Sequence, residues 1–338
     1  MEQNIAISSV VAKDKPRDYL MDNLRAILII LVVLGHLLTS MRSENEIIKS
    51  IYIFIYTFHM PAMTFISGYF SKNLEKIRSN AFVTIFIPYL ILNVIQYAYK
   101  LVVIKEEVSG FRFLRPSWGL WYLLALFLWK FFLKDLLKLR HLLLFSFTFA
   151  IISGFSSEFS EYLALGRAVC FLPFFVLGNY CRTRHITRIR KLPKALSYII
   201  LLAVVLLSVY ASQLKIFDTE LLYLRSPYPE NNPVISMLFR IGIYVVAIGM
   251  MIALFNLVTS KKTFLSYVGR NTMTVYILHL FTIPLLEKLE LFKNQPYLYL
   301  VYSVFMTAAI IFIFTRRVVK QAYDTIMEKL YGLVLKAY

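Results

Sequence analysis

The chain contains apolar runs that are long enough to cross a lipid bilayer. The run LRAILIILVVLGHLL, from Leu24 to Leu38, holds a single arginine and a single histidine among apolar residues. With 59% hydrophobic residues and a mean hydropathy of +0.66 over 338 residues, the chain is too apolar for a soluble domain. The runs are near-continuous and do not alternate, which excludes an outer-membrane barrel. We therefore expect an all-α, polytopic membrane protein.

Ten segments approach the roughly 20 residues that a transmembrane helix needs, although the fourth and fifth are short. They are 24–40, 50–71, 80–104, 118–134, 141–156, 162–181, 195–214, 233–258, 271–288 and 296–316. This layout predicts a short N-terminal segment (1–23), one transmembrane domain (24–316) and a C-terminal tail (317–338). For the tail, an interfacial helix and an ordinary surface helix both remain open.

The distribution of charge predicts how the helices are oriented. The net charge is +18, and the lysines and arginines fall in alternate loops, most densely between Arg182 and Lys194. The intervening loops carry acidic residues such as Glu106 and Glu220. By the positive-inside rule both termini are cytoplasmic. The basic excess then reflects topology and contact with anionic membrane lipid, and we expect no nucleic-acid partner.

Arg25 and His36 form the first candidate site. Eleven residues separate them, which places the two side chains about 16 Å apart on nearly the same face of one helix. Ionisable residues within a span usually face the bundle interior or a wet cavity and mark functional sites. His36 is a candidate general base, because an imidazole suits proton abstraction at neutral pH. Arg25 is a candidate anion-binding residue, oriented by Asp22 three residues earlier.

Two further histidines lie near the predicted membrane midplane. His59 is in the second predicted span and His279 in the ninth. Each is either part of the site or a hydrogen-bonded packing residue. The histidines have neither the i, i+4 spacing nor the cysteine partners of a zinc site, so we predict no metal.

Four residues near the outer ends of the spans are candidates for substrate binding. Arg167 and Arg240 are placed either to bind an anionic or sugar substrate or to pair with Glu161 and interfacial lipid. Trp118 and Trp121 form either an aromatic belt at the membrane surface or a stacking platform for a sugar ring.

Several motifs resemble the integral-membrane acyltransferase 3 family. Asp22, Arg25 and His36 in DNLRAILIILVVLGH match the family's first-helix signature. Further similar segments are FHMPAMTFISGYF at 58–70, GLWYLL at 119–124, GRAVCFLPFFVLGNY at 166–180 and GRNTMTVYILH at 269–279. The resemblance runs from about Arg17 to about Leu280. It is closest to the subgroup related to fucose 4-O-acetylases.

This resemblance implies a membrane O-acetyltransferase of the bacterial plasma membrane. Such enzymes transfer an acetyl group from acetyl-CoA to a sugar hydroxyl of a surface polysaccharide or glycolipid. His36 would then be the base, and Arg25 would hold the phosphates of acetyl-CoA on the cytoplasmic side. His59 and His279 would orient the acceptor or polarise the carbonyl. Arg167, Arg240, Trp118 and Trp121 would serve the acceptor.

Two other classes of function remain open. One is an exporter or flippase of a glycan, in which the midplane histidines relay protons. The other is a structural partner in polysaccharide synthesis. The pairing of Arg25 with His36 favours the enzyme, and the absence of an internal repeat weakens the exporter.

Overall fold

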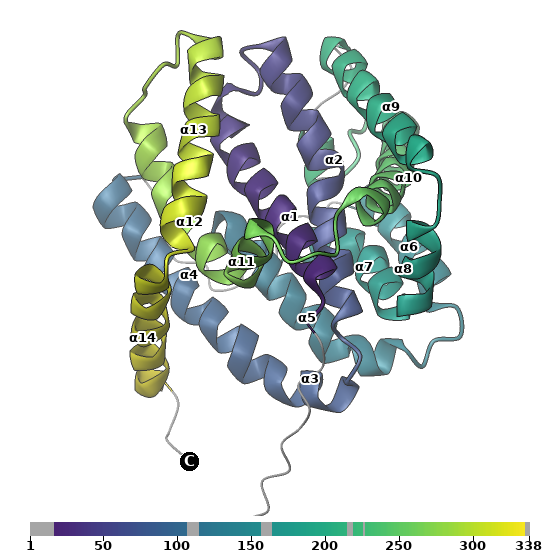
Figure 1. Ribbon diagram of the computed structural model, residues 1–338, viewed down its shortest axis with the longest axis horizontal. Helices are drawn as coiled ribbons and strands as arrows, with labels where there is room; N and C mark the ends of the chain where they lie inside the picture. The colour runs from purple at the N-terminus through teal and green to yellow at the C-terminus, as the bar shows by residue number, and fades with distance from the viewer. Residues whose placement is uncertain (1–16, 107–114, 157–163, 215–218, 226, 335–338) are drawn as a thin grey trace, which may run out of the picture.

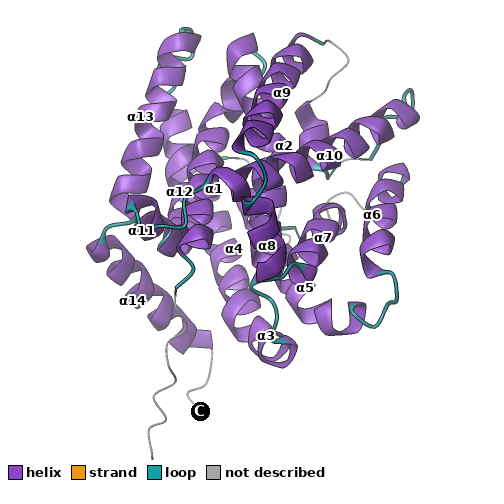
Figure 2. Cartoon of the chain, turned by 45° about the vertical axis from the view of Figure 1, so that its right-hand side comes forward, coloured by secondary structure: helices purple, strands orange, loops and turns teal. Residues whose placement is uncertain are grey.

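The computed structural model describes residues 17–106, 115–156, 164–214, 219–225 and 227–334. These residues form a bundle of helices joined by short loops, and they contain no strand (Figure 2). The α-helices are α1 (Tyr19–Leu38), α2 (Glu46–Tyr69), α3 (Leu74–Ala81), α4 (Ile87–Tyr99), α5 (Trp121–Leu136), α6 (Leu142–Ile152), α7 (Leu165–Tyr180), α8 (Thr183–Arg190), α9 (Lys194–Gln213), α10 (Pro233–Leu257), α11 (Phe264–Arg270), α12 (Thr272–Lys288), α13 (Pro296–Phe314) and α14 (Arg317–Val334).

Short turns of tighter or wider helix extend several of these elements. The 3₁₀ turns are η1 (Thr39–Met41), η4 (Trp118–Leu120), η5 (Ser153–Phe155) and η8 (Thr219–Tyr223). The π-helical turns η2 (Phe82–Phe86) and η3 (Lys100–Ile104) flank α4, so that α3 and α4 form one continuous helix from Leu74 to Ile104.

Helix α1 occupies the centre of the bundle. It contacts α2 as well as α11, α12 and α13 from the far end of the chain (Figure 1). Asp18 caps its N-terminus by accepting a hydrogen bond from the backbone N–H of Met21 at 3.3 Å. Most of its apolar side chains are buried, which is the pattern of a core helix rather than of a lipid-facing one. A polar side chain on α1 is therefore surrounded by protein on most sides.

Helices α2 and α7 approach each other unusually closely at two glycines. A Cβ atom on Gly68 would lie 2.0 Å from the carbonyl oxygen of Phe175, and one on Gly178 would lie 2.0 Å from that of Phe65. Small residues permit this kind of backbone contact between membrane helices. The contact sets the position of α7, which carries Arg167, against α2, which carries His59.

Six helices among the described residues are long and apolar enough to span a membrane. They are Tyr19–Met41, Glu46–Tyr69, Leu74–Ile104, Lys194–Gln213, Pro233–Leu257 and Pro296–Phe314. The predicted spans 118–134, 141–156, 162–181 and 271–288 correspond instead to α5, α6, α7 and α12, which have 16, 11, 16 and 17 residues. Residues 162 and 163 lie outside the described residues. The prediction of ten spans is therefore confirmed only for six.

The short length of α5 has a physical explanation. Helix α5 follows the turn η4, and Trp118 in that turn lines an internal cavity. Irregular backbone is tolerated at membrane depth where it is buried in protein or lines a cavity. Because the turn runs directly into the apolar residues of α5, hydropathy alone does not reveal where the helix begins.

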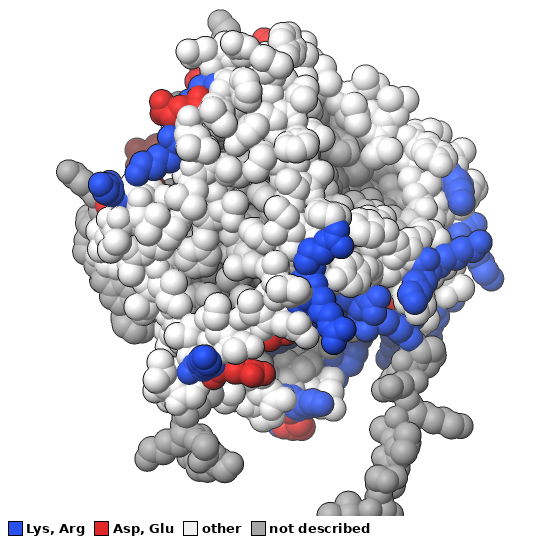
Figure 3. Space-filling view, turned by 60° about the vertical axis from the view of Figure 1, so that its left-hand side comes forward, with Lys and Arg blue, Asp and Glu red and all other residues white. Residues whose placement is uncertain are grey.

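The outer surface exposes many apolar side chains, as expected for a protein embedded in lipid. Helices α9 and α13 expose large apolar side chains along most of their length, among them Leu202, Leu206, Val301 and Phe305. In Figure 3 most visible lysines and arginines gather toward the lower right, beneath a broad uncharged surface. Helices α3, α8 and α14 lie on the side of the bundle where α1 begins (Figure 1). The cytoplasmic location of that side stays a prediction.

Candidate active site

A cavity of about 560 Å³ lies inside the bundle, between α1, α2, α5, α7, α12 and the turn η8. Its lining includes Arg25 and Phe70 at one end, which we call the Arg25 end. It includes Arg42 and Arg225 at the other, which we call the Arg42 end. Its volume falls in the range of small-molecule binding sites. Arg25 and His36, which the sequence places on one face of α1, both line it.

His36 is held by His279 across the bundle. The two rings are stacked, and His36 Nδ1 lies 3.0 Å from His279 Nε2. His279 Nδ1 lies 3.0 Å from the carbonyl oxygen of Val275, which can only accept, so Nδ1 of His279 carries a proton. Nε2 of His279 is then an acceptor, and Nδ1–H of neutral His36 donates to it. This leaves the lone pair of His36 on Nε2, the nitrogen that a general base needs.

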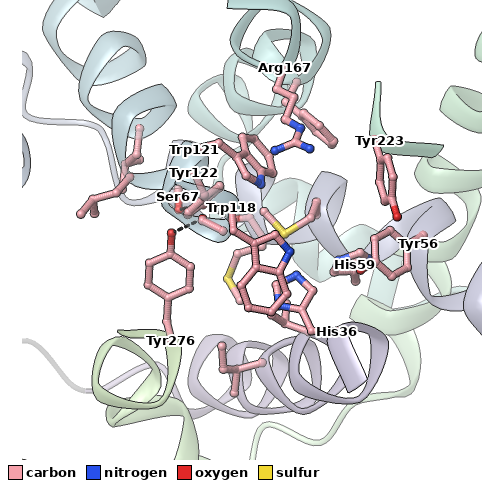
Figure 4. Close-up of a pocket in the computed structure, with 18 of the residues that line it drawn as sticks. His36, Tyr56, His59, Ser67, Trp118, Trp121, Tyr122, Arg167, Tyr223 and Tyr276 are labelled. Atoms are coloured by element: carbon pink, nitrogen blue, oxygen red, sulfur yellow. Dashed lines mark hydrogen bonds between the residues drawn. The ribbon is translucent and has the colours of Figure 1, made fainter. Parts of the chain in front are cut away.

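His59 occupies a similar position on α2. Its Nδ1 donates to the carbonyl oxygen of Ile55 at 2.7 Å, and its ring meets Tyr56 edge to face at 4.8 Å. The side chain lines the cavity together with His36, whereas His279 lies behind His36 and does not. Figure 4 shows His36 and His59 at the cavity, and His279 supports His36 from behind.

The Arg25 end contains an unsatisfied cationic group. Nε of Arg25 is buried and has no hydrogen-bond partner among the described residues. The guanidinium lies 4.7 Å from the ring centre of Phe70, and Nη1 is 3.8 Å from Asp22 Oδ1. The other carboxylate oxygen of Asp22 is bound more closely by Arg17, at 2.6 Å. Asp22 thus orients Arg25 loosely, and the Arg25 side chain, 28% exposed, lines the cavity.

The two tryptophans line the middle of the cavity. Trp118 packs on His36, with ring centres 4.6 Å apart, and its backbone has a positive φ of 32°. Such a conformation is unusual for a large side chain and is often found at functional sites. Trp121 packs between Phe171, at 5.3 Å, and the guanidinium of Arg167, at 4.8 Å. Both residues are available to contact a bound molecule.

The two outer arginines have different surroundings. Arg167 lines the cavity and points into it between Trp121 and Tyr223 (Figure 4). Arg240 does not line this cavity. It is buried over the ring of Tyr228 and donates to the carbonyl oxygen of Ala150 at 3.0 Å. Arg240 therefore holds α10 against α6. The predicted partner Glu161 lies outside the described residues.

Sequence reasoning missed several cavity residues. They are chiefly hydroxyl and charged side chains: Tyr56, Ser67, Tyr122, Tyr276, Tyr223, Lys130, Arg42, Glu220 and Arg225. Tyr56 precedes His59 by three residues and Ser67 follows Met63 by four, so the helical spacing on α2 was a usable signal. Arg42, Glu220 and Arg225 lie in connecting segments, where no periodicity indicates which side chains point inward.

A family model described as an acyltransferase domain, that of acyltransferase 3, matches residues 18–316. The chain belongs to the acyltransferase 3 family. The match covers α1 to α13 and so includes every residue that lines the cavity. The comparisons with curated proteins and with solved structures found no match. Membership in the acyltransferase 3 family makes the protein a multi-pass membrane acyltransferase.

Proposed function

We propose that this protein is a bacterial plasma-membrane O-acetyltransferase. It transfers the acetyl group of cytoplasmic acetyl-CoA to a hydroxyl of a sugar in a cell-surface polysaccharide or glycolipid, as the fucose 4-O-acetylase-like subgroup does. The observation that carries the proposal is that His36, hydrogen-bonded to His279, lines a cavity that Arg25 also lines. That pair presents an unprotonated nitrogen where a hydroxyl can approach.

The donor enters from the Arg25 end. The guanidinium of Arg25, with Lys130 in the same lining, suits the phosphates of coenzyme A. The narrow pantetheine arm then reaches along α1 toward His36, about 16 Å further on. In this arrangement the phosphates stay at the basic, cytoplasmic side, and only the thioester enters the bundle.

The chemical step is direct acyl transfer. As Nε2 of His36 takes the hydroxyl proton of the acceptor, the hydroxyl oxygen bonds to the carbonyl carbon of the thioester. The carbon–sulfur bond then breaks, and coenzyme A leaves as a thiol after receiving the proton from His36. The bond from His36 to His279 keeps the proton-accepting nitrogen toward the cavity and stabilises the imidazolium that forms.

A labelling assay tests this proposal. The purified full-length protein, in detergent, is incubated with acetyl-CoA labelled in the acetyl group and with a glycan extract from cells lacking the gene. We expect release of free coenzyme A thiol together with label in the glycan. Succinyl-CoA is tested in parallel as an alternative donor. Movement of the glycan across reconstituted vesicles without any label transfer would contradict the proposal and favour a flippase.

A further inference from the structure

Arg167 has no ion-pair partner among the described residues. Its guanidinium lies 4.8 Å from the ring centre of Trp121 and 5.9 Å from that of Tyr223, and it lines the cavity. No carboxylate among the described residues lies within ion-pairing distance of it. A guanidinium placed within a bundle of apolar helices is energetically costly unless it is paired. Such a group is retained where a ligand supplies the missing charge.

The surroundings of Arg167 add to the positive charge. At the Arg42 end, Glu220 Oε1 accepts from Arg42 at 3.2 Å, and Glu220 Oε2 accepts from Arg225 at 2.9 Å. One carboxylate is thus shared by two arginines, and Arg167 is the third cation at this end of the cavity. Among the described residues, this part of the cavity has three guanidinium groups and one carboxylate. A neutral sugar has no charge to complement that excess.

The guanidinium of Arg167 determines which kind of anion can bind. A guanidinium binds a carboxylate or a phosphate through two parallel hydrogen bonds, which fixes the orientation of the bound group. The ring of Trp121 holds the guanidinium in place through a cation–π contact. Trp118 and Tyr56 line the same cavity as Arg167, His36 and His59, and a sugar ring would lie in this space.

On this geometry we infer that the acceptor is an acidic glycan, whose carboxylate or phosphate binds Arg167 while its hydroxyl faces His36. The inference rests on the proposed function and specifies its substrate class. The phosphates of acetyl-CoA bind elsewhere, at the Arg25 end. Arg167 therefore acts on the acceptor and not on the donor.

Analysis of cellular glycans gives the first test. Surface glycans from cells with the gene deleted are compared by mass spectrometry with those from complemented cells. We expect an acetyl group to be lost from a sugar unit that carries, or directly adjoins, a carboxylate or a phosphate, and the fragment masses tell these two apart. Loss of acetyl from a wholly neutral repeat would overturn the inference and leave the proposed function intact. Unchanged acetylation of all glycans would contradict the proposed function.

The purified enzyme gives the second test. The acceptor is the identified glycan, in its native form and after its carboxylate has been reduced to the alcohol or its phosphate removed. For the wild type, we expect neutralisation to lower kcat/KM for the acceptor about 10- to 100-fold. This comparison needs no variant, so it stands even if a substitution disturbs folding.

Variants then assign the effect to one residue. In Arg167→Gln the native acceptor should be used no better than the neutral form, whereas KM for acetyl-CoA should be unchanged. Arg317→Gln, on the exposed surface of α14, is the matched control and should retain the wild-type preference. If Arg167→Gln weakened both acceptor forms equally, or raised KM for acetyl-CoA, the assignment of Arg167 to the acceptor's anion would be wrong.

Discussion

Nδ1 of His36 lies 3.0 Å from Nε2 of His279, although 243 residues separate them in the chain. The bond joins α1 to α12 in the core of the bundle, and both side chains are largely enclosed by protein. Because His279 is itself oriented by the carbonyl of Val275, a single chain of donors and acceptors determines which nitrogen of His36 faces the cavity.

Replacing His36 should abolish most of the acyl transfer. Removing a general base typically lowers the rate about 10²- to 10⁴-fold, and we expect that loss in kcat for His36→Ala. The measurement is the release of coenzyme A thiol in the presence of acceptor. His141→Ala is the control, because His141 is exposed and distant from the cavity. A folded His36→Ala protein with wild-type turnover would exclude His36 as the base.

His279 should act as a positioning residue. In His279→Gln, the amide oxygen can still accept the hydrogen bond from His36, whereas in His279→Leu no acceptor remains. We expect kcat to be at least about tenfold lower in the leucine variant than in the glutamine variant, with KM for acetyl-CoA the same in both. Equal activity of the two variants would indicate that His279 serves packing only.

Arg25 should recognise the phosphates of the donor. In Arg25→Gln, kcat/KM for acetyl-CoA should fall about 10- to 100-fold, because charge-assisted hydrogen bonds are lost. S-acetyl-pantetheine lacks the phosphates of the nucleotide end, so the variant and the wild type should use it equally well. The comparison is made by steady-state kinetics with both donors. An equal loss with the two donors would instead assign Arg25 to the structure of α1.

Gly269 should be essential for the packing of α11 against α1. A Cβ atom at Gly269 would lie 1.8 Å from the carbonyl oxygen of Asp22, and neither backbone can move easily. We expect Gly269→Ala to lower the free energy of unfolding by about 1–3 kcal/mol or more, seen as a lower melting temperature in detergent. Gly332→Ala is the matched control.

Gly332 differs from Gly269 in having open space around it. A Cβ atom at Gly332 in α14 meets no other atom within 4 Å. Alanine there should leave stability unchanged or raise it by about 0.5–1 kcal/mol, because alanine favours the helix. Similar destabilisation in both variants would show that the close approach of two backbones is not the cause of the effect at Gly269.

Much of the fold and part of the site could be predicted from local sequence. The class of protein follows from the length of the apolar runs, because only helices satisfy their own backbone groups in lipid. The shared face of Arg25 and His36 follows from the helical repeat, which depends on residues close together in the chain. Six of the ten predicted spans are long enough, whereas the short helices α5, α6, α7 and α12 were not distinguished from full spans.

Local sequence therefore specifies an all-helical membrane protein with a polar pair on its first helix. The packing of distant helices places His279 behind His36, directs Arg167 into the cavity and directs Arg240 toward α6. Arg167 and Arg240 look equivalent in sequence, since each is an arginine near the end of an apolar segment. The rotation of each helix about its own axis separates them, and contacts between distant segments, such as the glycine crossing of α2 and α7, set that rotation.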